Sequence, residues 1–290
     1  MTEAQTTGNG DKSIGDIIAE ANNLSAGQVS QVLAHQQKTG LKFGEAAVAL
    51  GFIKREDVLW ALSQQFHYPY QAEGGTAVCA ELVVATKPFD AASEFFRDIR
   101  SRLISEVFAD DREPRKALAI CSPNVGDGKS FFSANLAVAF SQLGGRTLLV
   151  DADMRTPRLH EVFGLESPKS GLSGILSGRN ETNVIRPVDA LPSLFLLPVG
   201  TVPPNPLELI QRPVFDHLIN ELVRKFDYVL VDTPAASHGA DARVIAAKCG
   251  ASVAIARRGQ TTVPAMRQLV ALLNKPSQEF GGVILNEFAS

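Results

Sequence analysis

The chain has 290 residues, which is enough for one large domain or for a medium-sized domain and a smaller one. It is 45% hydrophobic and 20% charged with a net charge of −3, so it has a globular composition and no basic footprint for nucleic acid. The three cysteines have no metal-type spacing, and no apolar run approaches the ~20 residues that span a bilayer. We therefore expect neither a cysteine-based metal site nor a membrane-spanning helix.

The first part of the chain predicts a polar tail and a small helical module. Residues 1–11 are polar and rich in Gly and Thr, which is typical of a disordered segment. The motif Ile14-Gly15-Asp16 returns 29 residues later as Phe43-Gly44-Glu45. A repeat of this length is one supersecondary unit used twice, so we predict two repeats, each of two short helices, over residues 12–72.

A linker and a larger domain follow the module. Residues 73–88 contain Gly74-Gly75 and lack strong periodicity, so we interpret them as a linker to a domain over residues 89–290. This domain is expected to open with a helix at 91–108. The apolar stripe predicted for that helix consists of Phe95, Ile99, Leu103 and Val107.

The same helix carries a row of charged residues. Glu94, Arg97 and Arg100 recur every three residues and therefore lie along one helical face. Such a row is usually a solvated surface with local ion pairs. Two arginines and a glutamate also suit bidentate pairing between subunits, and both interpretations stay open at this point.

Residues 117–143 have the strand, turn and helix that a phosphate-binding loop requires. An apolar run at 117–121 predicts a buried strand, and 131–143 predicts a helix. The glycines between them let backbone N–H groups converge on phosphate oxygens, and the helix N-terminus adds partial positive charge. Lys129 would reach the β- and γ-phosphates, and the Ser130 hydroxyl would bind Mg²⁺. The predicted cofactor-binding residues of this loop are Val125, Gly126, Asp127, Gly128, Lys129, Ser130 and Phe131.

The loop departs from the usual pattern G-x-x-x-x-G-K-[ST] at one position. Pro123 stands where the first glycine is expected. A Gly-rich turn that caps a helix is therefore the alternative interpretation of this stretch taken alone. The strand before it and the helix after it favour the phosphate loop.

From residue 117 onward, expected strands alternate with expected helices, which is the pattern of a parallel α/β sheet. We therefore predict an α/β fold class: a P-loop NTPase with a mostly parallel sheet flanked by helices, preceded by a small all-α repeat module. The further strands are expected at 146–150, 194–198, 228–231, 251–256 and 282–285.

Three aspartates directly follow expected strands. Asp151, Asp153 and Asp232 should gather beside the loop, because ligands of parallel sheets bind at the carboxyl ends of the strands. Carboxylates and hydroxyls suit Mg²⁺, so Ser130, Asp151 and Asp232 are the predicted metal ligands. Asp153 could accept a proton from an attacking nucleophile, and the predicted catalytic set is Lys129, Asp151, Asp153 and Asp232. A single such aspartate could be a strand-end turn residue, whereas three beside a G-K-S loop favour a site.

These motifs resemble those of bacterial tyrosine kinases (BY-kinases) of the exopolysaccharide chain-length-determinant type. The resemblance covers about residues 80–288 and rests on five stretches: the loop from Ser122 to Ser130, Leu148 to Arg155, Val229 to Pro234, the E-x-x-R-x-x-R helix, and Pro203 to Pro206. It implies ATP and Mg²⁺ as cofactors. It also implies that Arg155 and Asn286 contact the nucleotide, and that Glu94, Arg97 and Arg100 build a ring of subunits.

The resemblance implies partners as well. The family works with a membrane-embedded polysaccharide co-polymerase (Wzz/Wzc-like), so we expect a cytoplasmic protein that reaches the inner membrane through this partner and binds no nucleic acid. The helical module resembles the N-terminal domain of type II secretion and pilus ATPases, some of which bind cyclic di-GMP. Ser13 and Lys42 replace the arginines of that motif and Asn22 replaces a glycine, so we favour a docking module over a nucleotide sensor.

The chain also departs from the kinase family. Many members end in a cluster of tyrosines that they autophosphorylate, whereas this chain ends Asn286-Glu-Phe-Ala-Ser290 and has only Tyr68, Tyr70 and Tyr228. We predict an ATP-dependent tyrosine kinase with ATPase activity that regulates exopolysaccharide polymerisation, chain length and export. The alternatives are a nucleotide-gated scaffold and a positioning ATPase of the partition class. The latter class carries a second lysine where this chain has Asn124.

Overall fold

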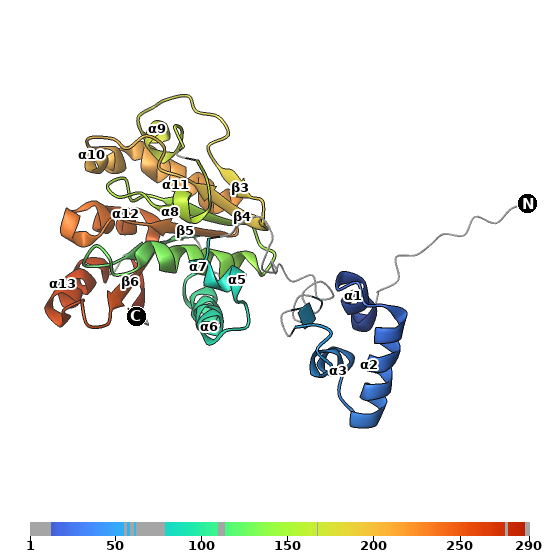
Figure 1. Cartoon of the computed structure of the whole chain (residues 1–290). Coiled ribbons are helices and arrows are strands. Elements are labelled where there is room, and N and C mark those ends of the chain that lie inside the picture. The colour runs from blue at the N-terminus through green and yellow to red at the C-terminus, as the bar shows by residue number, and fades with distance from the viewer. Residues whose placement is uncertain are drawn as a thin grey trace, which may run out of the picture. The chain divides into compact units, whose positions relative to one another are not determined.

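The computed structural model describes residues 13–54, 57–58, 61, 79–109, 114–166, 168–275 and 278–287. They fall into two compact units that divide between Gly75 and Thr76, and each unit is described by itself (Figure 1). The predicted tail at 1–11, the domain boundaries at 72 and 73, and the tyrosines Tyr68 and Tyr70 lie outside the described residues.

The smaller unit contains the helices α1 (Ile14–Ala21), α2 (Ala26–Thr39) and α3 (Phe43–Ala49). Ser13 and Ser25 cap the first two, because each hydroxyl accepts a hydrogen bond from a backbone N–H of the first turn. The repeated glycine has a packing reason: a Cβ on Gly44 would lie 2.7 Å from Val58 Cγ1. The helices enclose a small core of Ile18, Val32, Ala46, Ala47, Ile53 and Ala61. Helices are thus present in the predicted module, and about half of its second repeat lies outside the described residues.

The larger unit is built on a seven-stranded sheet with the order β3-β4-β2-β5-β1-β6-β7. All pairings are parallel except β3 with β4, which is antiparallel at one edge. The predicted α/β fold with a mostly parallel sheet is confirmed. The strands are β1 (Ala117–Cys121), β2 (Thr147–Asp151), β3 (Arg186–Val188), β4 (Leu191–Leu197), β5 (Tyr228–Asp232), β6 (Gly250–Arg257) and β7 (Glu279–Asn286).

Helices cover both faces of this sheet (Figure 1). One face packs on α5 (Val83–Thr86), α6 (Ala91–Glu106) and α7 (Lys129–Ser141), where Leu118 and Ile120 of β1 are buried. The remaining helices are α8 (Leu159–Val162), α9 (Leu172–Leu176), α10 (Pro206–Gln211), α11 (Pro213–Lys225), the short 3₁₀ helix η1 (Ala236–His238), α12 (Asp241–Cys249) and α13 (Val263–Leu273). No helix among the described residues has the length and apolar character needed to cross a membrane.

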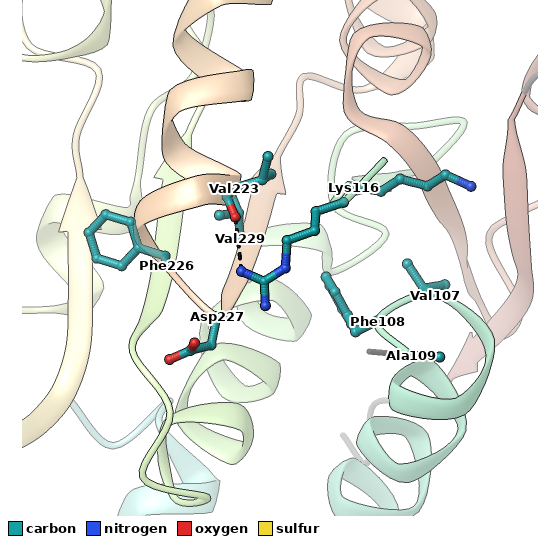
Figure 2. Close-up of a pocket in the computed structure, with 9 residues that line it drawn as sticks. Val107, Phe108, Ala109, Lys116, Val223, Phe226, Asp227 and Val229 are labelled. Atoms are coloured by element: carbon teal, nitrogen blue, oxygen red, sulfur yellow. Dashed lines mark hydrogen bonds between the residues drawn. The ribbon is translucent and has the colours of Figure 1, made fainter. Parts of the chain in front are cut away.

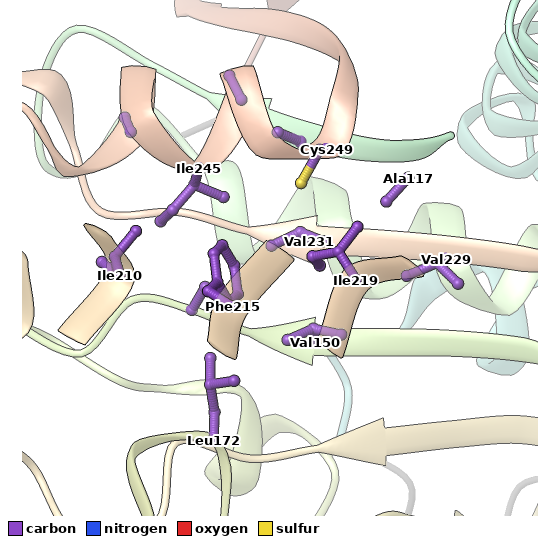
Figure 3. Packing of buried hydrophobic residues seen from close by; sticks show 14 of the residues in the cluster. Ala117, Val150, Leu172, Ile210, Phe215, Ile219, Val229, Val231, Ile245 and Cys249 are labelled. Carbon is purple, nitrogen blue, oxygen red and sulfur yellow. The ribbon is translucent and has the colours of Figure 1, made fainter. Parts of the chain in front are cut away.

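The second face of the sheet carries the other half of the core. Figure 3 shows Phe215 of α11 and Ile245 of α12 packed over Val150 and Val231 of neighbouring strands. Alternate residues of the same strands thus enter opposite cores, which is why the strands read as continuous apolar runs. This burial on both faces fixes the strand register, and the register in turn fixes which side chains emerge at the strand ends.

Helix α6 presents a different apolar face from the predicted one. Phe95 is 48% exposed, whereas Phe96 is buried against the rings of Phe131 and Phe132, at centroid distances of 6.2 and 5.4 Å. The predicted place of Phe95 on the stripe was wrong because two adjacent aromatic residues leave the phase of the helix open. Ile99, Leu103 and Val107 are buried as expected.

The structure differs from the predicted linker over residues 79–88. Leu82 and Val84 are buried in the core of the larger unit, and Asn135 of α7 holds the segment in place. Asn135 Oδ1 accepts a hydrogen bond from Val84 N at 3.1 Å, and its Nδ2 donates to Glu81 O at 2.8 Å. The larger unit therefore includes residues that precede the predicted start at 89.

A pocket lies at the amino ends of β1 and β5 (Figure 2). Its lining includes Phe108, Lys116 and Asp227, and Arg115 Nη1 donates to Val223 O at 3.3 Å beside it. Ligands of open parallel sheets bind at the opposite, carboxyl ends of the strands. This pocket is therefore separate from the phosphate loop and is not the nucleotide site.

Candidate nucleotide and magnesium site

The loop between β1 and α7 has the backbone geometry of a phosphate cradle. Gly126 and Gly128 have φ angles of 84° and 96°, in the left-handed region where a side chain would be strained. A Cβ on Gly128 would also overlap Nδ2 of Asn286. Helix α7 begins directly after this loop at Lys129, so its first N–H groups and its dipole favour an anion there.

The outward side of the loop is braced by Arg257 at the end of β6, Thr261 shortly after β6, and Asn286 at the end of β7. Arg257 Nη1 donates to Gly126 O at 3.0 Å, and Asn286 Nδ2 donates to Asp127 O at 3.1 Å. The buried Asp127 carboxylate accepts from Asn124 N and from Thr261 Oγ1, both at 2.8 Å. The carbonyls of Gly126 and Asp127 are thus bound on this side, and Asn124 N is used by Asp127, so phosphates would meet the N–H groups of the later loop residues and of the start of α7.

Of the three bracing residues, one was predicted from the sequence to have another role and two were not predicted. Asn286 was predicted to contact the nucleotide, and here its amide binds the loop backbone; a contact with the nucleotide stays a prediction. Arg257 and Thr261 were not predicted. Each acts across more than a hundred residues of sequence, and no motif marks either position.

The irregular start of the loop is bound to the segment after β5. Ser237 N donates to Pro123 O, and Ala236 N donates to Ser122 O, both at 2.9 Å. Pro123 therefore contributes a bound carbonyl where the usual pattern has glycine. The departure from that pattern coexists with an intact loop geometry.

Asp232 at the end of β5 is buried against the start of α7. Its carboxylate accepts hydrogen bonds from Ser130 Oγ at 2.7 Å and from Ser133 Oγ at 2.9 Å. Burial raises the pKa of Asp232 to about 6, while the Lys129 charge and the two hydroxyls oppose that rise. Ser133 was missed from the sequence, although its position one turn after Lys129 places it on the sheet side of α7.

Asp151 and Asp153 lie beside it at the end of β2. Asp151 is directly opposite Asp232 in the β2–β5 register, and its carboxylate accepts from Asp153 N at 3.2 Å and Leu159 N at 3.3 Å. Burial, and then the charges of Asp232 and Asp153, raise the pKa of Asp151 well above its usual value. Asp153 accepts from Thr156 N and Thr156 Oγ1, both at 2.9 Å. The three predicted carboxylates are thus brought together.

This arrangement fits a magnesium ion. Two buried carboxylates face each other, and burying their charges is costly without a compensating cation. Among the described residues no group of three or more His, Cys, Asp or Glu side chains is placed so that it could hold a metal ion by itself. Mg²⁺ needs no such cage, because it keeps waters and binds substrate phosphates. Ser130, Asp232 and Asp151 are the residues that would hold it.

Arg155 forms an ion pair with Asp241, a residue that was not predicted from the sequence. Its guanidinium donates to both carboxylate oxygens of Asp241, at 3.1 and 3.0 Å from Nη2. Asp241 begins α12 and is 1% exposed. The ion pair therefore ties the loop after β2 to α12, and the predicted contact between Arg155 and nucleotide stays a prediction.

The charged row on α6 makes contacts within the chain. Arg97 pairs with Glu94 and donates to Pro88 O, and Arg100 Nη1 donates to Ala139 O of α7 at 2.6 Å. Local ion pairing thus describes part of the row. The Glu94 side chain is 67% exposed and is the member of the row most open to solvent. A role in assembly is a separate prediction.

Comparison with known proteins identifies the family of the chain. A family model described as "ParA: NUBPL iron-transfer P-loop NTPase" matches residues 113–287. The tyrosine-protein kinase CpsD of Streptococcus agalactiae is 32% identical over 194 residues, which cover 67% of this chain and 82% of CpsD. The tyrosine-protein kinase wzc of Salmonella typhimurium is 33% identical over 207 residues, which cover 71% of this chain and only 28% of wzc.

A solved structure of a tyrosine kinase domain supports the same family. The kinase domain of the Escherichia coli tyrosine kinase ETK superposes with a TM-score of 0.67 at 29% identity, covering 75% of this chain and 84% of that domain. The similarity thus extends over a region that contains the loop, the three aspartates and the charged helix. The chain belongs to the bacterial tyrosine-protein kinase family, within the ParA-type P-loop NTPases.

Proposed function

We propose that this chain is an ATP-dependent protein tyrosine kinase with ATPase activity that regulates exopolysaccharide polymerisation, chain length and export. The observation that carries the proposal is the cluster of Asp151, Asp153 and Asp232 beside the α7 loop. Family membership supports the type of acceptor, because the relatives are named tyrosine-protein kinases.

The chemistry follows from the position of each group. The phenolic oxygen of an acceptor tyrosine forms a bond to the γ-phosphorus, and the bond from that phosphorus to the β,γ-bridging oxygen breaks, which releases ADP. Asp153 accepts the phenolic proton. Lys129 and the loop N–H groups neutralise charge on the transferred group; Ser130, Asp151 and Asp232 would hold Mg²⁺, which would supply further neutralisation.

A substitution of the loop lysine tests this function directly. Lys129→Met should abolish ATP turnover and the formation of phosphotyrosine, measured by phosphate release and by mass spectrometry of the full chain with Mg·ATP. Lys275→Met, which removes an exposed lysine after α13, is the matched control and should behave as wild type. Unchanged turnover in Lys129→Met would leave a nucleotide-independent scaffold as the better interpretation.

We further propose that the chain forms a ring at the cytoplasmic face of the inner membrane, beneath a polysaccharide co-polymerase. The exposed Glu94 is the best probe of the ring, because Arg97 and Arg100 also stabilise the fold of the single chain. Glu94→Ala should shift the assembled species toward monomer in light scattering with the partner present. Arg102→Ala, on the same helix and outside the row, should leave assembly unchanged.

The helical module is proposed to dock a protein partner. Ser13 and Lys42, which replace the arginines of the related sensor motif, both serve as N-cap residues. Ser13 Oγ accepts from Asp16 N at 3.3 Å, and Lys42 N donates to Glu45 Oε2 at 3.0 Å. These helix-capping roles support a structural module rather than a site for cyclic di-GMP.

A further inference from the structure

We propose that a cleft beside the Asp153 loop receives the tyrosine side chain of the acceptor protein and favours acidic residues next to that tyrosine. The inference rests on the proposed kinase function and deepens it. The cleft has a volume of about 380 Å³, and the lining residues that carry the argument are Pro157, His160, Pro168, Lys169, Val199 and Val202.

The sheet order places this cleft on the side where an acceptor must approach. The phosphate loop follows β1, Asp232 ends β5, and Asp151 ends β2, so the site runs along neighbouring strands toward β4. The walls of the cleft are the segments that follow β2 and β4. On the other side, Arg257 and Asn286 lie against the loop and bind its backbone carbonyls. The γ-phosphate is therefore reached from the cleft side.

One wall of the cleft is bonded directly to the catalytic carboxylates. Thr156, immediately before Pro157, donates from both its backbone and its hydroxyl to Asp153 at 2.9 Å. Leu159 N, between Pro157 and His160, donates to Asp151 at 3.3 Å. These hydrogen bonds join the cleft wall to the carboxylate proposed to accept the phenolic proton, and phosphoryl transfer requires that the phenol and this carboxylate be brought together.

The opposite wall is preformed. A Cβ on Gly171 would overlap Pro198 O, so these two backbone segments are in close contact. Ser173 Oγ donates to Thr201 O at 2.5 Å, and Thr201 Oγ1 donates to Lys169 O at 3.0 Å. These contacts hold the backbone around Lys169 against the segment after β4, so the cleft exists before an acceptor arrives.

The lining has the chemistry of a site for a tyrosine in an acidic segment. Two prolines and two valines offer apolar surface to an aromatic ring, and the cleft volume lies in the range of small-molecule sites. Among the described residues of the lining, Lys169 and His160 are basic and none is acidic, although Glu161 Oε1 lies 3.9 Å from His160 Nε2, so Lys169 is the main source of positive charge. Lys169 is exposed, so its charge faces the approaching chain. The complementary partner therefore carries Asp or Glu beside its tyrosine.

Two random copolymers, one of Glu and Tyr and one of Lys and Tyr, test the cleft on the full-length chain. Lys169→Glu should lower kcat/KM for phosphorylation of the Glu/Tyr copolymer about three- to tenfold, as expected for reversing one exposed charge contact, and should raise use of the Lys/Tyr copolymer. Val202→Asp should also impair the Glu/Tyr copolymer, because Val202 is 51% exposed in the cleft. Basal ATP hydrolysis should stay within about twofold of wild type.

The outcomes separate the cleft from the kinase function. Lys275→Glu makes the same charge change away from the cleft and should phosphorylate both copolymers as wild type does. If wild type phosphorylates the copolymers and Lys169→Glu and Val202→Asp match it, the cleft is not the acceptor site although the kinase function stands. If wild type hydrolyses ATP and transfers no phosphate to either copolymer, the kinase function itself fails. A loss of activity toward both copolymers in Lys169→Glu would indicate structural damage and contradict charge recognition.

Discussion

The two sides of the phosphate loop are stabilised in opposite ways. On the β6–β7 side, hydrogen bonds from other residues of the chain hold the loop: Arg257 and Asn286 bind loop carbonyls, and Thr261 binds Asp127. On the β2–β5 side, Asp151 and Asp232 bring two carboxylates together in a buried place. The first side is complete without a ligand, whereas on the second the Lys129 charge offsets the buried carboxylates only in part, because the pKa values of Asp151 and Asp232 stay raised.

This difference assigns each side its task. The hydrogen bonds of the brace hold the loop in one conformation, so its N–H groups are preorganised for phosphate. The buried carboxylates on the other side repel each other, which favours binding of a nucleotide that carries a metal ion. The predictions below break one side at a time. On the carboxylate side, Asp153→Asn should change the rate of phosphate transfer and Asp232→Asn should raise stability, while substitutions in the brace should lower affinity and stability.

The largest effect is expected from the proposed proton acceptor. Asp153→Asn should lower the rate of phosphotyrosine formation by about 100-fold or more, because general base catalysis contributes about 10²–10⁴. The affinity for ATP, measured by calorimetry, should stay close to that of wild type. Asp189→Asn removes an exposed carboxylate between β3 and β4 and is the control. A normal rate in Asp153→Asn would assign proton transfer to another group.

The next largest effect is a gain in stability, expected from a substitution of Asp232. Asp232→Asn should raise the free energy of unfolding of the nucleotide-free protein by about 2 kcal/mol at pH 7, since burial lifts the pKa of Asp232 to about 6 and the folded state bears the cost of the charge. As the pH falls from about 6 to about 4, wild type takes up this proton on folding and gains stability, so the gap should narrow. Urea denaturation at several pH values measures this difference in unfolding free energy. A variant less stable than wild type at pH 7 would contradict the interpretation that the buried charge of Asp232 destabilises the nucleotide-free protein.

A smaller loss is expected when the brace loses its hydroxyl. Thr261→Val removes the donor to the buried Asp127 carboxylate and should cost about 1–3 kcal/mol of unfolding free energy. Thr261→Ser keeps the hydroxyl and should retain most of the stability. Catalytic rate at saturating ATP should fall less than in Asp153→Asn. Equal stability of the valine and serine variants would show that the hydroxyl does not brace the loop.

The smallest effect separates bracing from base recognition at Asn286. Asn286→Ala should weaken ATP and inorganic tripolyphosphate alike, each by about fivefold, because it releases the carbonyl of Asp127. Glu287→Ala, at the next and exposed position, should change neither affinity. Weakened ATP with unchanged tripolyphosphate would instead place Asn286 on the base, as the family resemblance implies.

The sequence was most informative where the chemistry is local. The loop from Gly126 to Ser130 and the aspartates at the strand ends form short motifs, and alternating strands and helices were sufficient to predict the parallel sheet. The sheet brought Asp151 and Asp232 together because both end adjacent parallel strands. These features depend on neighbours within a few residues, so one sequence contains the whole signal.

The missed features act over long separations or are too short to detect. Asp241 binds Arg155, and Asn135 anchors Val84. Neither Asp241 nor Asn135 lies in a motif or periodic pattern from which its distant partner could be predicted. Strand β3 was not predicted because it is three residues long and contains Pro187, which confines it to a sheet edge. Tertiary packing, rather than local sequence, decided each of these.

The dependence of nucleotide binding on magnesium tests the contrast between the two sides most directly. Calorimetry should compare the affinity for a non-hydrolysable imido analogue of ATP with Mg²⁺ and with EDTA. In wild type, Mg²⁺ should strengthen binding by at least about tenfold, whereas in Asp232→Asn the gain should fall below about twofold. Equal affinities with and without Mg²⁺ in wild type would contradict the claim that a metal-bound nucleotide completes the carboxylate side.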